Sequence, residues 1–410
     1  MTNGVVPEPD PTEDEDRASG GQSSAENERS RASGIWVIVG LLILLSVPAT
    51  GLFLFAEVPD PSGLLISAIA AVIPAIFYVW LAFWIDKREK EPLVLRLGAF
   101  LWGSTVAVVF AAVLNTFFGL AALSVAGPAF ASFSTTVIAA PIVEESIKGL
   151  AVLILFLTLR DEFDNVLDGI LYGSLVGIGF AMTENVIYFG RSYLEGGLPL
   201  LGQLFLLRAV YGGLGHALYT GTAGAGLGYA REMAYRPSAT ILAVIAFGFA
   251  IFQHSAWNLF AGTVIPALMP ADIDSTLYLF LLAPLISLIL TGPGFVLLFA
   301  IGYAALRREV RIIQLHLRDE VASGIVAPEE YALLSSVRQR TWHRLQALFT
   351  HGFTTWRLLG QLYQAETELA IAKWHAELGD NCRSLVPHAP EEQYRRLILE
   401  IRQKVSRSTH

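Results

Sequence analysis

The chain has 410 residues, of which 54% are hydrophobic and only 16% are charged, and its mean hydropathy is +0.53. Soluble domains carry about 25% charged residues, so this composition excludes an ordinary soluble protein and indicates a polytopic membrane protein. The net charge of −8 is not accompanied by a basic patch, so nucleic acid is not an expected partner. The single cysteine, Cys382, excludes an intrachain disulfide and a thiolate metal site.

The first 33 residues form an acidic tail. They hold eight acidic residues and three arginines among Pro, Ser and Gly, and this composition cannot bury a core, so we expect disorder over residues 1–33. No basic segment precedes an apolar stretch here, which argues against a cleaved signal peptide. The first span is therefore expected to insert without cleavage.

Windows of about 20 apolar residues predict membrane-spanning helices. Eight are expected, at 35–55, 64–85, 94–119, 134–159, 167–190, 203–229, 239–264 and 277–305. The predicted fold class is thus an all-α polytopic membrane protein. Every second connection is basic, with charges at Lys87, Arg88, Lys90, Arg96, Arg160, Arg231, Arg236, Arg307, Arg308 and Arg311, whereas the other connections hold only Arg191. The positive-inside rule then places both termini in the cytoplasm.

Residues 306–410 differ from the rest in composition. They contain 15 Lys and Arg, 12 Asp and Glu, and six of the eight histidines. Helical periodicity predicts a cytoplasmic helical domain here, which we interpret as a regulatory or oligomerisation appendage. The expected organisation is therefore an acidic tail (1–33), a transmembrane domain (34–305, core 70–265) and this domain. The sequence does not predict an oligomeric state.

Two adjacent carboxylates, Glu144 and Glu145, lie inside the fourth predicted span. Glu144 is about 15 Å from the start of that span at helical rise, close to the bilayer midplane. An ionised side chain at this depth costs on the order of 3 kcal/mol. Lys148 follows one turn later and could neutralise Glu144, but this pairing leaves Glu145 on another face. Adjacent midplane glutamates indicate a functional site more often than a structural one.

Further polar residues occur in the next three spans, so four consecutive helices are expected to converge on one internal site. They are Glu184, Asn185, His216, His254 and Asn258. Taken singly, each histidine could be a hydrogen-bonded core residue, and Glu184 could serve a helix–helix contact. Arg208 is expected to extend toward the membrane surface. Small residues at a spacing of four predict close packing of the fifth and sixth spans, at Gly169, Gly173, Gly177, Ala217, Gly221 and Ala225.

Two histidines and a carboxylate are a common ligand set for catalytic zinc. The residues therefore predict a divalent metal, Zn²⁺ by preference, held by Glu145, His216 and His254. A metal activates water near neutral pH, and a second glutamate can then transfer protons. Asn258 could donate to a developing oxyanion. Hydrolysis of a peptide bond in or beside a membrane segment suits these groups.

Four motifs carry a resemblance to a known family. Glu144-Glu145-Ser-Ile-Lys148 matches an EExxK pattern, and the segments around Asp168–Tyr188, His216–Gly221 and His254–Asn258 resemble three further blocks. Together they resemble the PrsW family of intramembrane metalloproteases, and more distantly the CAAX-protease and bacteriocin-processing superfamily. Asn165 stands where an acidic residue occurs in some relatives.

The resemblance implies an enzyme of the bacterial cytoplasmic membrane that cleaves a membrane-anchored protein, such as an anti-sigma factor, on the outer side. It implies catalytic roles for Glu144, Glu145 and His216, with Glu184 and His254 as further site members. A metal-free mechanism with glutamate-activated water stays open. So do two other functions: a proton- or cation-coupled transporter, since transporters also bury such residues, and a non-catalytic scaffold.

Overall fold

The computed structural model describes residues 11–85, 91–159, 162–233, 237–264, 267, 275–377 and 391–409. These residues are almost entirely helical, and none of them lies in a β-strand, which confirms the predicted all-α class. Cys382 and the basic loop residues Lys87, Arg88, Lys90, Arg160 and Arg236 lie outside the described residues.

Six segments are long and apolar enough to cross a membrane. They are Gly34–Glu57, Pro61–Phe83, Leu93–Thr158, Val166–Glu232, Pro237–Val264 and Ser275–Ala322. The third and fourth have 66 and 67 residues, or about 100 Å of helix each, which is three times the thickness of the hydrocarbon layer. Each is therefore long enough for two crossings. The expected total of eight stays a prediction.

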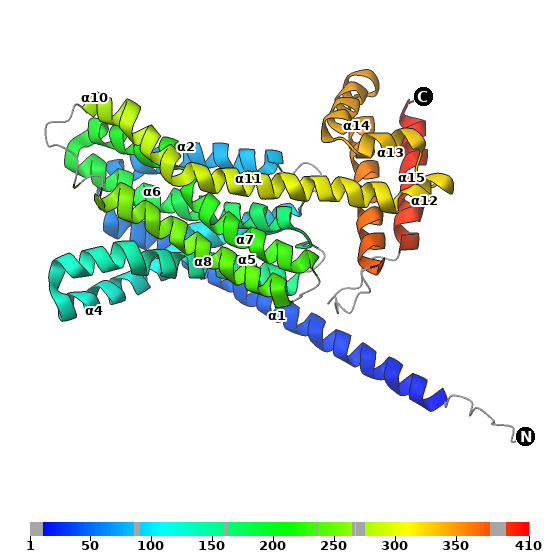
Figure 1. Ribbon diagram of the computed structural model, residues 1–410, viewed down its shortest axis with the longest axis horizontal. Helices are drawn as coiled ribbons and strands as arrows, with labels where there is room; N and C mark the ends of the chain where they lie inside the picture. Colours follow the sequence, from blue (N-terminus) through cyan, green and yellow to red (C-terminus); the bar gives the residue numbers. More distant parts are fainter. Residues whose placement is uncertain are drawn as a thin grey trace, which may run out of the picture.

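Both long segments contain a glycine at which the helix is interrupted. Gly127 has φ of 79° and precedes Pro128, and Gly197 has φ of 67° and lies just before Pro199. Positive φ is readily adopted only by glycine, and the proline that follows prevents the helix from simply continuing. In Figure 1 the chain folds back within α4, so that two rods lie side by side.

The membrane region is a bundle of helices with short π-helical segments (η) inserted between them. Its elements are α1 (Pro11–Glu57), α2 (Pro61–Ile85), α3 (Leu93–Leu101), η1 (Trp102–Ala107), α4 (Val108–Ser134), η2 (Thr135–Ala139), α5 (Ala140–Thr158), α6 (Val166–Phe205), η3 (Leu206–Tyr211), α7 (Gly215–Glu232), α8 (Pro237–Leu259), η4 (Phe260–Val264), α10 (Ser275–Leu277), η5 (Tyr278–Leu282) and α11 (Ala283–His316). The start of α1 and the C-terminal helices lie at the same end of the bundle (Figure 1).

Helix α1 begins at Pro11, inside the segment for which the sequence predicts disorder. Only its second half, Gly34–Glu57, has the hydropathy of a span. The first half has the acidic composition described above and no apolar face to bury. Disorder of the tail in solution stays a prediction.

Helices α6 and α7 are antiparallel and touch through their backbones. A Cβ atom added at Gly169, Gly173 or Gly177 would lie 2.1, 2.4 or 2.3 Å from the carbonyl oxygen of Gly224, Thr220 or His216, respectively. No side chain fits in this space, so the glycine stripe of α6 is required by the contact. The expected close packing of these two helices is confirmed.

Asn165 caps the N-terminus of α6. Its side chain accepts hydrogen bonds from the backbone N–H groups of Leu167 and Asp168, and the Asp168 carboxylate accepts one from the N–H of Asn165. This reciprocal capping box satisfies N–H groups that the first helical turn leaves unpaired. Asn165 therefore serves as an N-cap, a role for which asparagine and aspartate are similarly suited.

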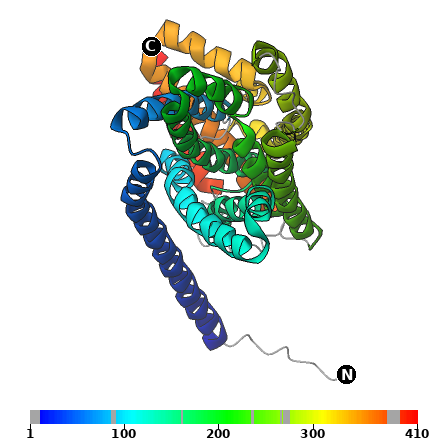
Figure 2. The same cartoon turned by 90° about the vertical axis from the view of Figure 1, so that its left-hand side faces the viewer.

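The C-terminal region is a separate cluster of helices: α12 (Arg318–Ala322), α13 (Pro328–Leu334), α14 (Val337–Glu377) and α15 (Glu391–Thr409). Their core includes Leu317, Leu334, Leu362, Leu369 and Ile398, each at most 1% exposed. The boundary expected at 305/306 falls inside α11, which runs unbroken from the bundle into this domain (Figure 1). Figure 2 shows the bundle from its opposite end.

Candidate active site

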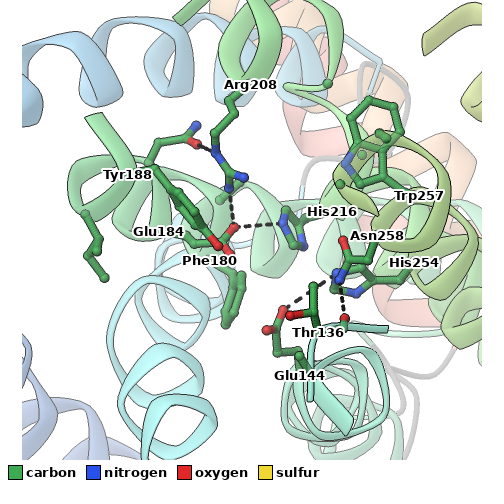
Figure 3. Close-up of a pocket in the computed structure, with 18 of the residues that line it drawn as sticks. Thr136, Glu144, Phe180, Glu184, Tyr188, Arg208, His216, His254, Trp257 and Asn258 are labelled. Atoms are coloured by element: carbon green, nitrogen blue, oxygen red, sulfur yellow. Dashed lines mark hydrogen bonds and ion pairs between the residues drawn. The ribbon is translucent and has the colours of Figure 1, made fainter. Parts of the chain in front are cut away.

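The polar residues of the predicted site line a cavity of about 650 Å³ between the membrane helices. Glu144 comes from α5, Glu184 from α6, His216 from α7, and His254 and Asn258 from α8. Figure 3 shows these five side chains pointing toward one another across the cavity. Of the six predicted catalytic residues, only Glu145 does not line it.

Glu145 is buried behind the cavity and accepts three hydrogen bonds. Its Oε1 receives Lys148 Nζ at 2.5 Å and His254 Nδ1 at 2.9 Å, and its Oε2 receives the Thr220 hydroxyl at 2.9 Å. The side chains of Glu145 and Lys148 are both 0% exposed. A carboxylate with this many donors is stabilised as an anion despite its burial, and it has little capacity left for a metal.

The contact with Glu145 orients His254. Because a carboxylate can only accept, Nδ1 of His254 donates the hydrogen, and its Nε2 carries the lone pair. This Nε2 lies 3.8 Å from Glu144 Oε2. Among the described residues Glu144 Oε2 has no hydrogen-bond partner, although it is buried. The ionised Glu144 and the neutral His254 thus turn two acceptor atoms toward each other.

Glu144, His216 and His254 could together hold a metal ion, since each offers a ligand atom within 4.8 Å of the others. The orphaned Glu144 oxygen beside the His254 lone pair fits a divalent cation, because both atoms would otherwise lose solvation without gaining a partner. A carboxylate that orients a metal-binding histidine from behind is a frequent arrangement, and Glu145 has this position. The geometry therefore favours Glu144 where the sequence indicated Glu145.

His216 lies between two oppositely charged groups. Its Nδ1 is 3.0 Å from Lys148 Nζ and its Nε2 is 3.1 Å from Glu184 Oε2. Since an ammonium group can only donate, Nδ1 accepts and Nε2 donates to Glu184. Both ring nitrogens are therefore engaged, and binding of a metal by His216 requires one of these two contacts to open.

Arg208 is a member of the site that the sequence did not indicate. Instead of extending to the membrane surface, it turns inward from η3 and donates to Glu184 Oε2 at 2.6 Å and to Asn185 Oδ1 at 2.9 Å. Its guanidinium also lies 3.9 Å from the ring centre of Tyr188 (Figure 3). Tyr188 lies one turn after Glu184, so the half-buried Arg208 makes an ion pair and a cation–π contact with the same face of α6.

Asn258 has a different partner from the expected one. Its Nδ2 donates to the backbone oxygen of Thr136 at 2.9 Å, inside η2. A π-helical segment leaves a carbonyl without its usual helical partner, and Asn258 satisfies one of these. Asn115 of α4, also missed from the sequence, approaches Glu144 Oε1 at 3.4 Å.

Four π-helical segments contribute to the cavity wall: η2, η3, η4 and η5, through Thr135, Thr136, Leu207, Arg208, Tyr211, Ala261, Gly262 and Tyr278. Such wider turns occur frequently at functional sites. In η3 the wider turn is followed by Gly212, where α6 and its extension end before α7. Two of its carbonyls are bound by side chains of other helices, Ala209 by Tyr78 and Tyr211 by Ser287.

Comparisons with known proteins point to one family. Residues 91–289 match the family model of the PrsW family intramembrane metalloproteases. Proteins named Protease PrsW match with 34% identity over 126 residues in Geobacillus kaustophilus, 32% over 127 in Clostridioides difficile and 30% over 119 in Bacillus subtilis. These alignments cover 31%, 29% and 29% of this chain. The chain spans about half the length of these relatives (53%, 48% and 51%). No solved structure matches the chain significantly.

Proposed function

Residues 91–289 belong to the PrsW family, and from this premise we propose that the protein is an intramembrane metalloprotease that hydrolyses a peptide bond of a membrane-anchored protein. One observation carries the proposal: Glu144 Oε2, which has no hydrogen-bond partner in the described part of the chain, faces His254 Nε2 at 3.8 Å on the wall of the cavity. A buried carboxylate oxygen without a hydrogen bond is costly, so the retention of Glu144 at this place supports a role in binding or chemistry.

The proposed metal ligands are Glu144, His216 and His254. When bound, a divalent ion such as Zn²⁺ supplies Lewis acidity, which activates water near neutral pH. Glu145 keeps its hydrogen bond to His254 Nδ1 and so holds the Nε2 lone pair toward Glu144. Lys148 fixes Glu145 within α5 by their ion pair. Since both ring nitrogens of His216 are engaged, His216 would release either Lys148 or Glu184 to hold the ion.

Glu184 is proposed to transfer the proton. It lines the cavity beside Arg208, which donates to it at 2.6 Å, so as an anion it can take a proton from the attacking water and deliver it to the leaving amine. Arg208 compensates the charge that Glu184 carries after it gives up the proton. The same residues also permit a metal-free reaction, in which Glu144 and His254 would orient the attacking water directly. Asn258 is proposed to stabilise η2 instead of the oxyanion.

The cavity is proposed to open on the outer side of the cytoplasmic membrane of a bacterium. Its lining includes Glu57 at the end of α1, Arg191 near Gly197, and Tyr278 of η5. These residues lie in or directly beside the connections with few positive charges, which the positive-inside rule places outside. Both termini would then be cytoplasmic, and the substrate segment would enter from the outer half of the bilayer. An anti-sigma factor is one substrate that fits this topology.

The test is cleavage of a single-span substrate by purified protein in liposomes. Glu144→Gln and His254→Asn are each expected to lower the cleavage rate about 10²–10⁴-fold, because they remove a reacting or ligand group. Leu150→Ala, on α5 but 45% exposed, is the matched control and should keep full activity. Thermal unfolding checks that each variant is folded. Full activity of either folded site variant would refute the proposal.

Metal content is measured on the same samples. The wild type is expected to contain about one ion per chain and Glu144→Gln to contain much less, whereas Glu145→Gln should lose less metal than Glu144→Gln. If the wild type cleaves the substrate and contains no metal under conditions where a chelator has no effect, the metal-free mechanism is correct instead. Equal loss of metal in both glutamate variants would contradict the assignment of Glu144 as the ligand.

A further inference from the structure

The C-terminal domain exposes an apolar stripe that its own core does not use. Helix α14 is broken at Gly352, where φ is 85°, and this divides it into two arms. On the first arm Trp342 is 70% exposed and Phe349 85% exposed, and Phe353, directly after the break, is 65% exposed. Large aromatic side chains with this exposure, close together on one element, mark an interaction surface.

The stripe lies opposite the face by which the arm packs on its own domain. At 100° per residue, Trp342, Leu345 and Phe349 fall within a sector of about 60°. Ala347 and Arg340, which are buried, lie about 140–160° away from Trp342 on the same helix. The first arm therefore packs on its own domain by one face and presents an apolar face to its surroundings on the other side.

The charge of this segment is one-sided. Between Val337 and Ala365 the sequence contains four arginines and two histidines and no Asp or Glu. Arg338, His343, His351 and Arg357 are exposed. An apolar stripe flanked by positive charge is the pattern by which helices lie in the surface of a membrane that contains anionic lipids.

The position of the arm fits that occupant. In Figure 1 the α14 hairpin lies between the ends of the membrane helices and α15, so it is the part of the domain nearest to the bilayer surface. In Figure 2 the orange part of α14 projects sideways past the outline of the bundle. Seen along the bundle, this part of α14 therefore extends beyond the membrane helices.

We propose that the first arm of α14, together with Phe353, binds the surface of the bilayer, with Trp342, Leu345 and Phe349 inserted among the lipids and Arg338 and Arg357 on anionic headgroups. The arm would fix the C-terminal domain against the membrane independently of α11. Binding is then expected to depend on the content of anionic lipid, since each arginine near such a surface contributes electrostatic attraction.

The test uses the full-length protein in nanodiscs. In a Cys382→Ser background, a fluorophore is attached to Gln346→Cys, beside the stripe, or to Glu400→Cys on α15, which lies on the far side of the domain in Figure 1. Lipids with a quencher near the headgroup should remove most of the emission at position 346 and little at position 400. The loss at position 346 should be larger in nanodiscs with phosphatidylglycerol than in zwitterionic ones.

Two variants give the matched comparison. Trp342→Ser with Phe349→Ser should abolish the quenching at position 346, and Arg338→Glu with Arg357→Glu should abolish its dependence on phosphatidylglycerol. All four side chains are exposed, so the domain should still fold, which thermal unfolding verifies. Equal quenching at positions 346 and 400 would overturn the proposal. The proposal would also be overturned if lipid quenching were absent and energy transfer occurred between labels on two copies of the chain. Loss of this transfer in the Trp342→Ser, Phe349→Ser variant would show that a second copy covers the stripe.

Discussion

Two regions of the molecule contain buried glutamates paired with basic residues, and they use them differently. In the C-terminal domain Glu320 accepts from Lys373 at 2.9 Å and from Arg395 at 2.7 Å, and these contacts join α12 to α14 and α15. In the membrane Glu145 and Lys148 form a similar pair within one helix. The difference is what lies next to the pair: the membrane pair continues through His216 and Glu184 to a cavity.

A buried acceptor oxygen without a hydrogen bond therefore indicates a functional site only when it also borders a cavity. Glu366 in the C-terminal domain also has a buried oxygen without a hydrogen-bond partner in the described part of the chain, and its side chain is 0% exposed. Glu144 has such an oxygen too, but it lines a cavity of about 650 Å³. Because Glu366 is fully enclosed, we interpret it as a protonated structural residue. Because Glu144 borders a cavity, we interpret it as a binding group. The following predictions test this distinction.

The largest effect is expected at Lys148. Lys148→Met leaves the buried Glu145 charge without its cation, which costs about 3–5 kcal/mol of stability, and cleavage should be lost. Combination with Glu145→Gln removes the uncompensated charge and should restore much of the unfolding temperature, but not activity, because His254 loses its orienting carboxylate. Thermal unfolding in detergent and the cleavage assay measure the two effects. Restoration of activity in the double variant would show that the pair is only structural.

Arg208 should have an intermediate effect. Arg208→Gln removes the cation from Glu184 and is expected to lower the cleavage rate about 10–100-fold, as for other groups that support a reacting residue. Arg208→Lys keeps the charge but cannot bind Glu184 and Asn185 together, so it should recover activity only in part. Arg191→Gln, which breaks the exposed pair with Glu57 at the same cavity, should change the rate little. Equal rates for the Arg191 and Arg208 variants would contradict this role.

The two glutamates of the C-terminal domain should show opposite pH dependence. Hydrogen bonds from Arg395 lower the pKa of Glu320, so its contribution to stability is present above about pH 4.5 and is lost as the pH falls below this value. Burial and the nearby Glu330 raise the pKa of Glu366 well above 4.5, so the domain loses stability as the pH rises above 4.5, by up to about 1.4 kcal/mol per unit.

Substitution by glutamine separates these two cases. Glu366→Gln should raise the unfolding temperature at pH 8 and change it little at pH 4.5, because glutamine resembles the protonated acid. Glu320→Gln should lower the unfolding temperature at pH 8. Unfolding of the full-length protein is followed by a fluorophore on α15. A destabilised Glu366→Gln variant at pH 8 would mean that the ionised form of Glu366 is the native one.

The smallest effect is expected at Asn258. Since its amide supports Thr136 and does not point to an oxyanion position, Asn258→Ala should cost about 1 kcal/mol, or less than about tenfold in rate. Loss of an oxyanion donor would cost about 10²–10³-fold. The cleavage rate of this variant, with its Michaelis constant, distinguishes the two roles. A hundredfold loss in kcat alone would restore the interpretation drawn from the sequence.

The polytopic all-α fold and the gathering of polar side chains could be predicted from the sequence, because both depend on the cost of placing charge in lipid. Which of Glu144 and Glu145 lines the cavity could not be predicted from the sequence. Adjacent residues point about 100° apart on a helix, and which of them meets the cavity depends on how α5 is rotated against α7 and α8. The structure settles that rotation by the contact of Thr220 with Glu145.

Arg208 was misread for a related reason. Its place near the end of a predicted span indicated a side chain directed to the membrane surface. The chain instead turns at Gly197, and the wider turn of η3 directs Arg208 toward α6. Sequence windows give the length of a span but not the direction of each side chain around it. A hydropathy profile also does not reveal π-helical segments such as η3, because it records composition and not backbone hydrogen bonding.

The glycine contact between α6 and α7 has a consequence for how the imidazole of His216 is held. The carbonyl of His216 itself is the atom that leaves no room for a Cβ at Gly177. Its location is thus dictated by main chain resting on main chain, without an intervening layer of side chains that could be repacked. Replacing the side chains around this contact therefore need not move the backbone of residue 216, whereas adding a single methyl group at Gly177 must shift it.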